Sequence, residues 1–181
     1  NDGKAGTAVG FGRLSDDLSR IDDFQVAFRQ QPKLSTGNHF GGRLVFDGKG
    51  YLWIALGENN QRPPAQQLDK LQGKLVRLTD QGKIPDDNPF VGQADKRPEI
   101  WSYGIRNPQG LAMNPWSNAL WLNEHGPRGG DEINIPEKAK TTAGRWRPGE
   151  LTTAGCLSRR LRAGKWTAPS SRFSTGKNPR P

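Results

Sequence analysis

The sequence predicts an all-β protein, and three observations support this prediction. Short apolar runs separated by glycine- and aspartate-containing turns fill residues 40–135. Helical periodicity is thin throughout the chain, and one hairpin pattern occurs twice. Hydrophobic residues are only 32% of the 181 residues and mean hydropathy is −0.83, which suits a loop-rich β protein better than a protein with a large compact core.

Residues 43–46 and 51–56 are expected to pair as a hairpin, because Asp47-Gly48 between them favours the positive φ of a tight turn. Residues 15–28 fit a helix or an extended chain equally well. The polar, proline-bearing segments 59–72 and 85–98 are expected to be loops. Further short strands are expected at residues 74–78, 99–103, 110–114, 119–123 and 132–135.

Residues 42–58 align with residues 109–124 as an internal repeat. Each segment has a hairpin, a Leu-Trp pair on its second strand, and an acid (Glu58 or Glu124) at the end of that strand. Such repeats are typical of β-propeller blades with long loops, whereas the alternative is two unrelated hairpins of similar composition. Because a blade takes about 40–50 residues, the chain is expected to hold roughly two to three blades of a partial propeller.

The net charge of +9 and the pI near 10.1 favour a nucleic-acid partner until the charge is located along the chain. Residues 141–181 contain nine of the 27 basic residues and one of the 18 acids, which leaves 18 basic and 17 acidic residues in 1–140. The sequence therefore divides into a domain at 1–140 and a basic tail at 141–181, which we expect to be unstructured.

The tail also has the composition expected of a wrong reading frame, since it lacks Ile, Val, Met and Tyr. Restoring one base in an adenine run near Lys140 makes plausible codons read Lys-Asn-Tyr-Gly-Trp-Pro, and aromatic and β-branched residues return. We therefore predict that the tail is out of frame, which sequencing of the coding DNA across codons 138–142 decides. A basic nucleic-acid-binding tail is the alternative.

Three further sequence features bear on disulfide bonds, membrane insertion and targeting. The lone cysteine, Cys156, lies in the tail, so no disulfide framework is expected. No apolar run is long enough for membrane insertion. The chain starts without methionine or a signal peptide, and any targeting segment is expected upstream of Asn1.

The segment 101–134 combines chemistry-bearing residues at the ends of expected strands. Arg106 can bind a carboxylate or polarised oxygen with two hydrogen bonds, and Asn107 and Gln109 add adjustable donors and acceptors. The Gly-Pro pair at 126–127 and the Gly-Gly pair at 129–130 expose backbone groups, as sites for hard cations or anionic cofactors require. This pattern indicates a binding or catalytic site.

Three segments carry a resemblance to a known family. Gly-Asn-His-Phe-Gly-Gly-Arg-Leu at 37–44, the residues at 103–110, and those at 124–134 resemble the soluble pyrroloquinoline-quinone-dependent glucose/sorbosone dehydrogenases, in particular their aldose sugar dehydrogenase branch. The resemblance implies a six-bladed β-propeller with the quinone in its central mouth above a calcium ion. The parent protein would oxidise aldose sugars at C1 to lactones and pass electrons to an external acceptor in the periplasm.

The resemblance also implies roles for single residues. His39 would be the general base that takes the proton from the anomeric hydroxyl as hydride leaves for the quinone, and Glu58 would orient it. Arg106 would stabilise charge on the quinone oxygen, while Asn107 and Gln109 would contact the cofactor. Taken alone, His39 would be an ordinary loop histidine and Glu58 a solvated acid.

The backbone carbonyls of Gly126 and Pro127 match the calcium ligands of the family, and Asp131 is a candidate to support their loop. His125 is expected to be structural, and the two tryptophans of the repeat to be core residues. The family's further cofactor contacts lie in blades absent here, so this fragment is expected to be inactive. A non-catalytic sugar- or calcium-binding propeller is the rival function, no nucleic-acid partner is expected, and the sequence does not give the oligomeric state.

Overall fold

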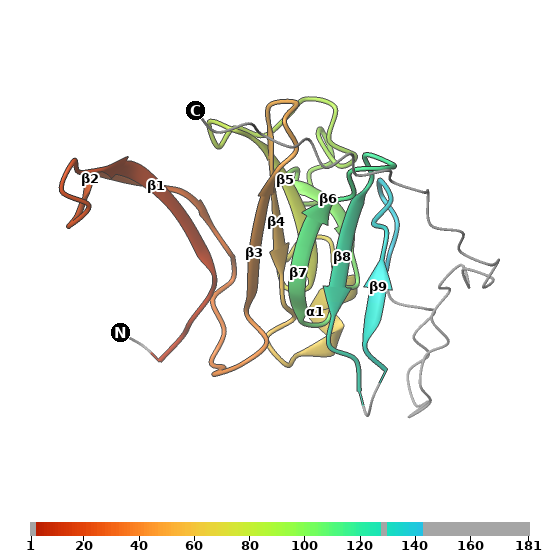
Figure 1. The fold of residues 1–181 in the computed structure, drawn as a ribbon. Coiled ribbons are helices and arrows are strands. Elements are labelled where there is room, and N and C mark those ends of the chain that lie inside the picture. The colour runs from red at the N-terminus through yellow and green to blue at the C-terminus, as the bar shows by residue number, and fades with distance from the viewer. Residues whose placement is uncertain (1–2, 128–129, 143–181) are drawn as a thin grey trace, which may run out of the picture.

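A computed structural model describes residues 3–127 and 130–142, and the regular secondary structure within them consists of strands apart from one short helix (Figure 1). The all-β prediction is confirmed. The strands are β1 (Ala8–Leu14), β2 (Ile21–Arg29), β3 (Gly41–Phe46), β4 (Tyr51–Leu56), β5 (Lys74–Thr79), β6 (Ile100–Tyr103), β7 (Pro108–Met113), β8 (Leu120–Glu124) and β9 (Glu132–Asn134), with one short helix, α1 (Arg62–Gln66).

The described strands form three antiparallel sheets, in the orders β1-β2, β3-β4-β5-β6 and β7-β8-β9. Figure 1 shows the four-stranded sheet in the centre, with the β7–β9 sheet beside it and the β1–β2 hairpin arching away on the other side. Each sheet is built from neighbouring segments of the chain, which is the arrangement expected of successive blades.

The two hairpins of the predicted repeat are present as β3–β4 and β7–β8. In the first hairpin the turn uses Gly48 and Gly50 at φ +72° and +91°. The side chain of Asp47 accepts hydrogen bonds from the Lys49 N–H at 2.7 Å and from the Trp53 indole N–H at 3.1 Å. The Asp-Gly turn therefore fixes the register that the sequence predicted.

The structure corrects two expectations at the start of the chain and in the first loop. The segment 15–28, for which helix and extended chain were both open, is extended and largely forms β2. It pairs with β1 at residues 8–14, where the sequence analysis predicted no strand. The segment 59–72 is not wholly a loop, because it contains α1. Prolines in the first turn are compatible with a helix, because the N–H groups of that turn have no hydrogen-bond partner within the helix. The segment 85–98 contains no named element, as predicted.

β4 and β5 of the central sheet are buried on both faces, which explains the unbroken apolar run of β4, whereas the edge strand β3 exposes Leu44 and Phe46. One face packs against the base of the β1–β2 hairpin, in a cluster of Val9, Phe28, Leu52, Ile54, Leu56, Leu71, Val76, Leu78, Phe90 and Ile100. The other face packs toward the β7–β9 sheet, in a cluster of Trp53, Ala55, Leu75, Ile105, Leu120 and Leu122. Trp53 is thus a core residue, as predicted.

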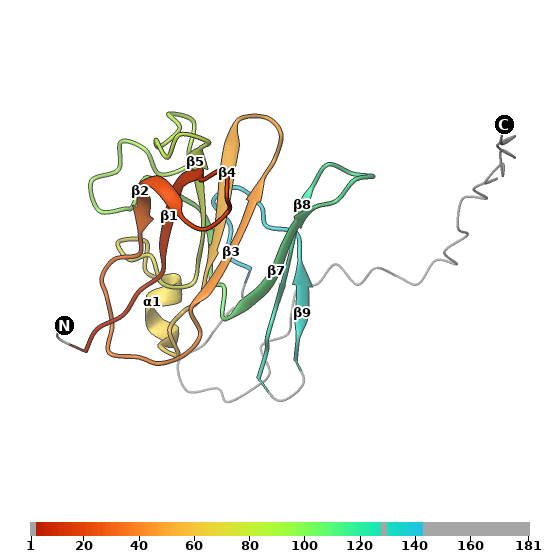
Figure 2. The ribbon, with the colours of Figure 1, turned by 60° about the vertical axis from the view of Figure 1, so that its left-hand side comes forward.

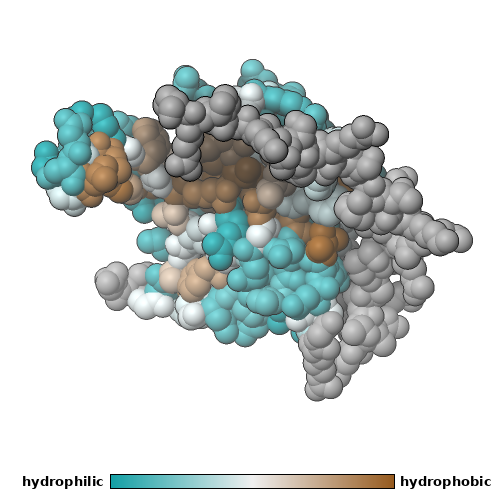
Figure 3. Space-filling model, in the orientation of Figure 1, coloured by the Kyte–Doolittle hydropathy of each residue, from teal (hydrophilic) through white to brown (hydrophobic). Residues whose placement is uncertain are grey.

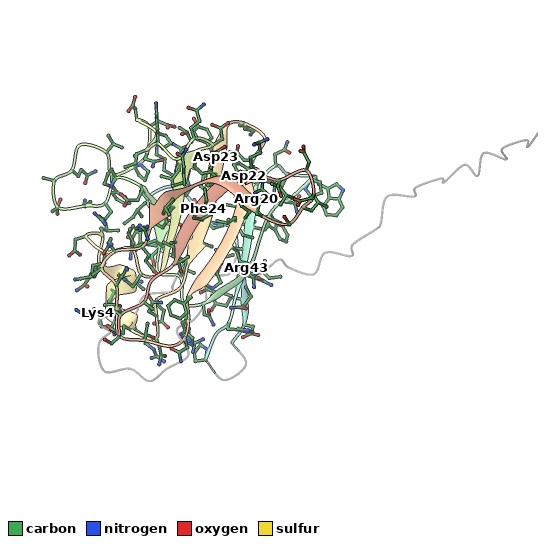
Figure 4. The ribbon with its side chains drawn as sticks, turned by 90° about the vertical axis from the view of Figure 1, so that its left-hand side faces the viewer. Lys4, Arg20, Asp22, Asp23, Phe24 and Arg43 are labelled. Carbon is green, nitrogen blue, oxygen red and sulfur yellow. The ribbon has the colours of Figure 1, made fainter. Side chains whose placement is uncertain are left out.

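The β1–β2 hairpin covers the central sheet only at its base and leaves apolar side chains exposed (Figures 2 and 3). The large exposed side chains there are Phe11, Leu14, Leu18, Ile21, Phe24 and Val26. Phe24 lies among the charged Arg20, Asp22 and Asp23 on this hairpin (Figure 4). Its ring occupies the space beside Gly10, where an added Cβ would lie 2.3 Å from the ring. Glycine at this position therefore allows the aromatic ring to pack across the strand pair.

Candidate functional site

The best-defined feature of the site is a histidine–carboxylate pair at one end of the central sheet. His39 precedes β3 and Glu58 follows β4, so the antiparallel pairing of these strands brings the two residues together. The His39 Nδ1 lies 2.6 Å from the Glu58 Oε1. Glu58 is buried and the imidazole is 15% exposed, so the pair is held firmly while one edge of the ring remains reachable.

The backbone around His39 is held in an unusual conformation. His39 has φ +53°, in the left-handed region that few side chains adopt. Its carbonyl accepts hydrogen bonds from the backbone N–H of Asn59 at 3.1 Å and from the Asn59 side-chain amide at 3.4 Å. Gly57 passes so close that an added Cβ would lie 1.9 Å from the His39 carbonyl oxygen. Asn59 and Gly57 therefore set the position of the imidazole.

Backbone hydrogen bonds join this pair to the segment that carries Arg106. The Glu58 N–H donates to the Arg106 carbonyl at 2.9 Å. Beside it, Gly73 donates to the Gly57 carbonyl at 3.0 Å and accepts from the Ile105 N–H at 3.1 Å. Gly73 has φ +66°, and a Cβ there would lie 2.5 Å from the Ile105 carbonyl oxygen. Only glycine fits this junction without strain.

The side chain of Arg106 reaches the next loop. Its Nη1 donates to the His125 carbonyl at 2.8 Å, and the His125 N–H donates to the Asn107 carbonyl at 3.1 Å. The Gln109 amide lies 3.1 Å from the Asn107 Oδ1, so these two side chains contact each other. The structure thus connects the three polar residues that the sequence singled out. His125 takes part through its backbone, and its Nδ1 also lies 3.3 Å from the Asp131 Oδ2 in the same loop.

The loop after β8 is built around Gly126. Its N–H donates to the Asp131 Oδ1 at 3.0 Å, and this bond is the main cause that holds the pKa of Asp131 below its usual value. A Cβ on Gly126 would lie 1.7 Å from the Gly130 carbonyl oxygen, so only glycine fits. The Pro127 carbonyl accepts the Gly130 N–H at 3.1 Å. The support predicted from Asp131 therefore exists as a hydrogen bond to the loop.

This loop is compatible with a hard cation. Calcium accepts backbone carbonyl oxygens as ligands, and the Pro127 carbonyl keeps a second lone pair beside its bond to Gly130. Within residues 3–127 and 130–142, no group of three or more His, Cys, Asp or Glu side chains could hold a metal ion.

Two buried charged residues near the site were not singled out from the sequence as functional. Glu124 accepts hydrogen bonds from the Arg106 N–H at 2.5 Å and from the Asn134 side chain at 2.8 Å, and burial raises its pKa to about 7. Lys74 is fully buried, and burial lowers its pKa to about 7. The internal repeat aligns Glu124 with Glu58, and this equivalence is the sequence signal that could have identified Glu124.

All of these groups lie at one end of the sheets, the lower end in Figure 1, where α1 also lies. Hydrogen bonds run without a break from His39 through Glu58, the Arg106 segment and His125 to the loop after β8. The arrangement can hold a proton acceptor, a fixed cation and a set of carbonyl oxygens in one place. Within the described residues, no helix is long and apolar enough to cross a membrane.

Comparisons with known proteins show which proteins this chain resembles. Residues 1–141 match the family model described as glucose/sorbosone dehydrogenase. The chain is 84% identical over 140 residues to the aldose sugar dehydrogenase YliI of Escherichia coli, a match that covers 77% of this chain and 38% of that protein. It is 34% identical over 121 residues to quinoprotein glucose dehydrogenase B of Acinetobacter calcoaceticus, covering 56% of this chain and 24% of that protein.

Solved structures show the same relationship. The soluble aldose sugar dehydrogenase of Escherichia coli in its apo form is similar with a TM-score of 0.77 and 82% identity, over 79% of this chain and 41% of that chain. The PQQ-bound form of the aldose sugar dehydrogenase of Streptomyces coelicolor is similar with a TM-score of 0.63 and 27% identity, over 82% of this chain and 42% of that chain. The chain therefore spans less than half the length of these relatives.

Proposed function

The chain belongs to the glucose/sorbosone dehydrogenase family, and from this premise we propose that it is part of a pyrroloquinoline-quinone- and calcium-dependent aldose sugar dehydrogenase. The whole protein would be a six-bladed propeller that oxidises aldose sugars at C1 to lactones. One observation carries the proposal most: the buried Glu58 carboxylate orients an accessible His39 next to the Arg106 segment. A base, an orienting acid and a fixed cation in this arrangement suit oxidation of a sugar hydroxyl.

His39 would act as the general base. Because Glu58 accepts at Nδ1, that nitrogen carries the hydrogen and Nε2 keeps its lone pair free. Nε2 can then accept the proton of the anomeric hydroxyl. Glu58 would hold the tautomer and stabilise the imidazolium that forms, as base–orienter pairs do in other enzymes.

Arg106, Asn107 and Gln109 would bind the cofactor. When bound, pyrroloquinoline quinone supplies the two-electron oxidant that accepts the hydride from the sugar C1. Arg106 offers a permanent positive charge whose direction is set by its bond to the His125 carbonyl. Such a preorganised charge stabilises negative charge as it develops on a neighbouring oxygen.

Gly126 and Pro127 would supply carbonyl oxygens to calcium, and Asp131 would hold their loop in shape. The matched segment covers only 38% and 41% of the two Escherichia coli relatives, and the other cofactor contacts implied by the family would lie in their remaining blades. We therefore propose that this chain does not catalyse the reaction alone. The external electron acceptor and a periplasmic location belong to the same proposal.

A non-catalytic propeller that binds sugar or calcium is the second candidate, and it would not need His39 paired with Glu58. The deciding experiment uses the full-length protein that contains this segment. Binding of pyrroloquinoline quinone is titrated with and without calcium, and dye reduction is then followed with glucose and other aldoses. We expect calcium-dependent quinone binding and aldose-dependent dye reduction. Sugar binding without dye reduction in the quinone-loaded protein would favour the non-catalytic alternative.

A further inference from the structure

We propose that Glu124 is a positioning residue for Arg106, equivalent in the second hairpin to what Glu58 is for His39 in the first. This inference rests on the proposed function, because it gives Arg106 its importance. Glu124 ends β8, and its carboxylate turns back into the molecule. It touches no substrate atom by this account and acts only through Arg106.

The side chain of Glu124 contacts the Arg106 turn and the last strand, β9. Its Oε2 accepts the Arg106 backbone N–H at 2.5 Å, and the Asn107 backbone N–H also stabilises its charge. Its Oε1 accepts the side-chain amide of Asn134 on β9 at 2.8 Å. One carboxylate therefore ties the turn before β7 to the last strand of the same sheet.

The consequence for Arg106 is geometric. The backbone of this residue is held from two sides, by Glu124 at its N–H and by Glu58 at its carbonyl. With both ends fixed, the side chain starts from a defined point and reaches the His125 carbonyl at 2.8 Å. Loss of the Glu124 contact frees one side of this backbone and lets the guanidinium shift.

Packing alone does not account for a carboxylate at this position. Glu124 is 6% exposed, and its hydrogen bonds come from neutral N–H groups. Burying a charge in such surroundings is costly, and an apolar side chain of similar size would usually pack at least as well. What an apolar residue cannot do is accept the two backbone N–H groups of the Arg106 turn.

The repeat supports the same conclusion. Glu58 and Glu124 occupy equivalent places after the second strand of each hairpin, and both are buried. Glu58 uses its side chain to hold an imidazole and its backbone N–H to hold Arg106. Glu124 uses its side chain to hold Arg106 from the opposite side. The equivalent glutamates of the two repeats therefore both bind the backbone of Arg106, the cation on which the proposed chemistry depends.

The test compares three substitutions of Glu124 with one control. Glu124→Gln keeps an acceptor for the Arg106 N–H, provided that Asn134 turns its amide over. Glu124→Leu removes the acceptor, and Glu124→Asp withdraws it from the Arg106 N–H by shortening the side chain by one methylene. The control is Glu99→Leu, which removes a buried carboxylate from the residue just before β6, where it pairs with Arg97 and not with the Arg106 turn. Hydrogen exchange of the amides at 105–107 is measured in the 181-residue chain, and kcat and aldose KM in the full-length protein.

We expect Glu124→Leu and Glu124→Asp to speed exchange at 105–107 and to lower kcat by about 100-fold while aldose KM stays within about 3-fold. Glu124→Gln should restore most of the loss, and Glu99→Leu should change neither readout. Unchanged exchange in both Glu124→Leu and Glu124→Asp would overturn the proposal even if the wild-type protein has no dehydrogenase activity. Faster exchange with unchanged kcat in an active enzyme would leave Glu124 a purely structural residue and also overturn it.

Discussion

Lys74 is a fully buried residue that would ordinarily carry a positive charge, and burial disfavours that charged form. Its ammonium donates to the carbonyls of Pro64 at 2.8 Å, Ala65 at 3.0 Å and Gln72 at 2.6 Å. These carbonyls belong to α1 and to the residues beside Gly73, which joins the His39 and Arg106 segments. Lys74 is therefore a buried hydrogen-bond donor that links α1 to the segment around Gly73 beneath the site.

This position gives the stability of the protein a defined pH dependence. Burial lowers the pKa of Lys74 from 10.5 to about 7, with Asp69 opposing and Lys70 reinforcing the shift. Between these values the unfolded chain binds more protons, so the free energy of unfolding should rise with pH from about 7 toward 10. The slope is at most about 1.4 kcal/mol per pH unit. Urea unfolding across this range measures it, and Lys74→Met should remove the slope. An equal slope in the variant would contradict the assignment.

Two residues of the site, Asn59 and Glu124, could not be identified from the local sequence. The motif pointed to His39, Glu58 and Arg106, but the contacts of Asn59 and Glu124 depend on strand pairings that bring distant segments together. Both are ordinary polar residues in local sequence. Only the repeat could have suggested Glu124, and nothing local distinguishes Asn59 from its neighbour Asn60.

At the scale of elements, the outer loop 85–98 is attached to the central sheet by Arg77 of β5. The guanidinium lies 4.5 Å from the ring centroid of Tyr51 and 4.4 Å from that of Trp101. Its Nε donates to the Asn88 side chain at 2.7 Å, and it also pairs with Asp87. A planar cation stacked between two rings and bonded to the loop explains how a segment without regular structure stays in place.

Arg77→Ala should therefore lower the free energy of unfolding by about 2–3 kcal/mol, because it removes charged hydrogen bonds and both ring contacts. Arg77→Lys keeps the charge but loses the planar fork, and we expect it to recover less than half of that loss. Chemical denaturation of the three proteins measures the difference. Full recovery by lysine would show that charge alone attaches the loop.

The elements differ in how well the sequence predicted them. Strands β3 to β9 follow local alternation and turn residues, and their bounds were predicted to within about two residues. β1 was missed because its apolar residues are interrupted by Gly10 and Gly12, whose role appears only when Phe24 and Ile21 pack over them. α1 was missed because its prolines were taken as loop signals, although the first turn of a helix tolerates proline.

In the molecule as a whole, β4 and β5 of the central sheet are covered on both faces, whereas the β1–β2 hairpin leaves apolar side chains exposed. Phe11, Leu14 and Ile21 are each more than half exposed on it, and Figure 3 shows apolar surface in this region. Neighbouring exposed apolar side chains of this kind differ from single ones, because together they form a surface that a partner or another part of a protein can cover.

We expect the 181-residue chain to bind an apolar fluorescent dye through this hairpin. The double substitution Phe11→Ser and Leu14→Ser should reduce the dye fluorescence at least twofold, since it breaks up the patch. Trp116→Ser is the matched control, because Trp116 is 85% exposed in the β7–β8 turn and isolated from the hairpin. An equal reduction by the control would mean that the hairpin is not the binding surface.

The basic tail predicted at 141–181 lies outside the described residues except for Thr141 and Thr142. The family match ends at residue 141, and the relative with 84% identity aligns over 140 residues. Both limits coincide with the change of composition near Lys140. They support our proposal that the domain ends there and that the reading frame changes, so the positive charge of the tail says nothing about the partners of the domain.

The central claim is that this segment carries the proton acceptor of a quinone-dependent sugar dehydrogenase. The most direct measurement is the effect of His39→Asn on the full-length protein, because asparagine tolerates the left-handed backbone found at φ +53°. We expect kcat with glucose to fall about 1,000-fold while the affinity for pyrroloquinoline quinone stays within about 3-fold of the wild type. An unchanged kcat, or a loss of quinone binding as large as the loss of turnover, would contradict it.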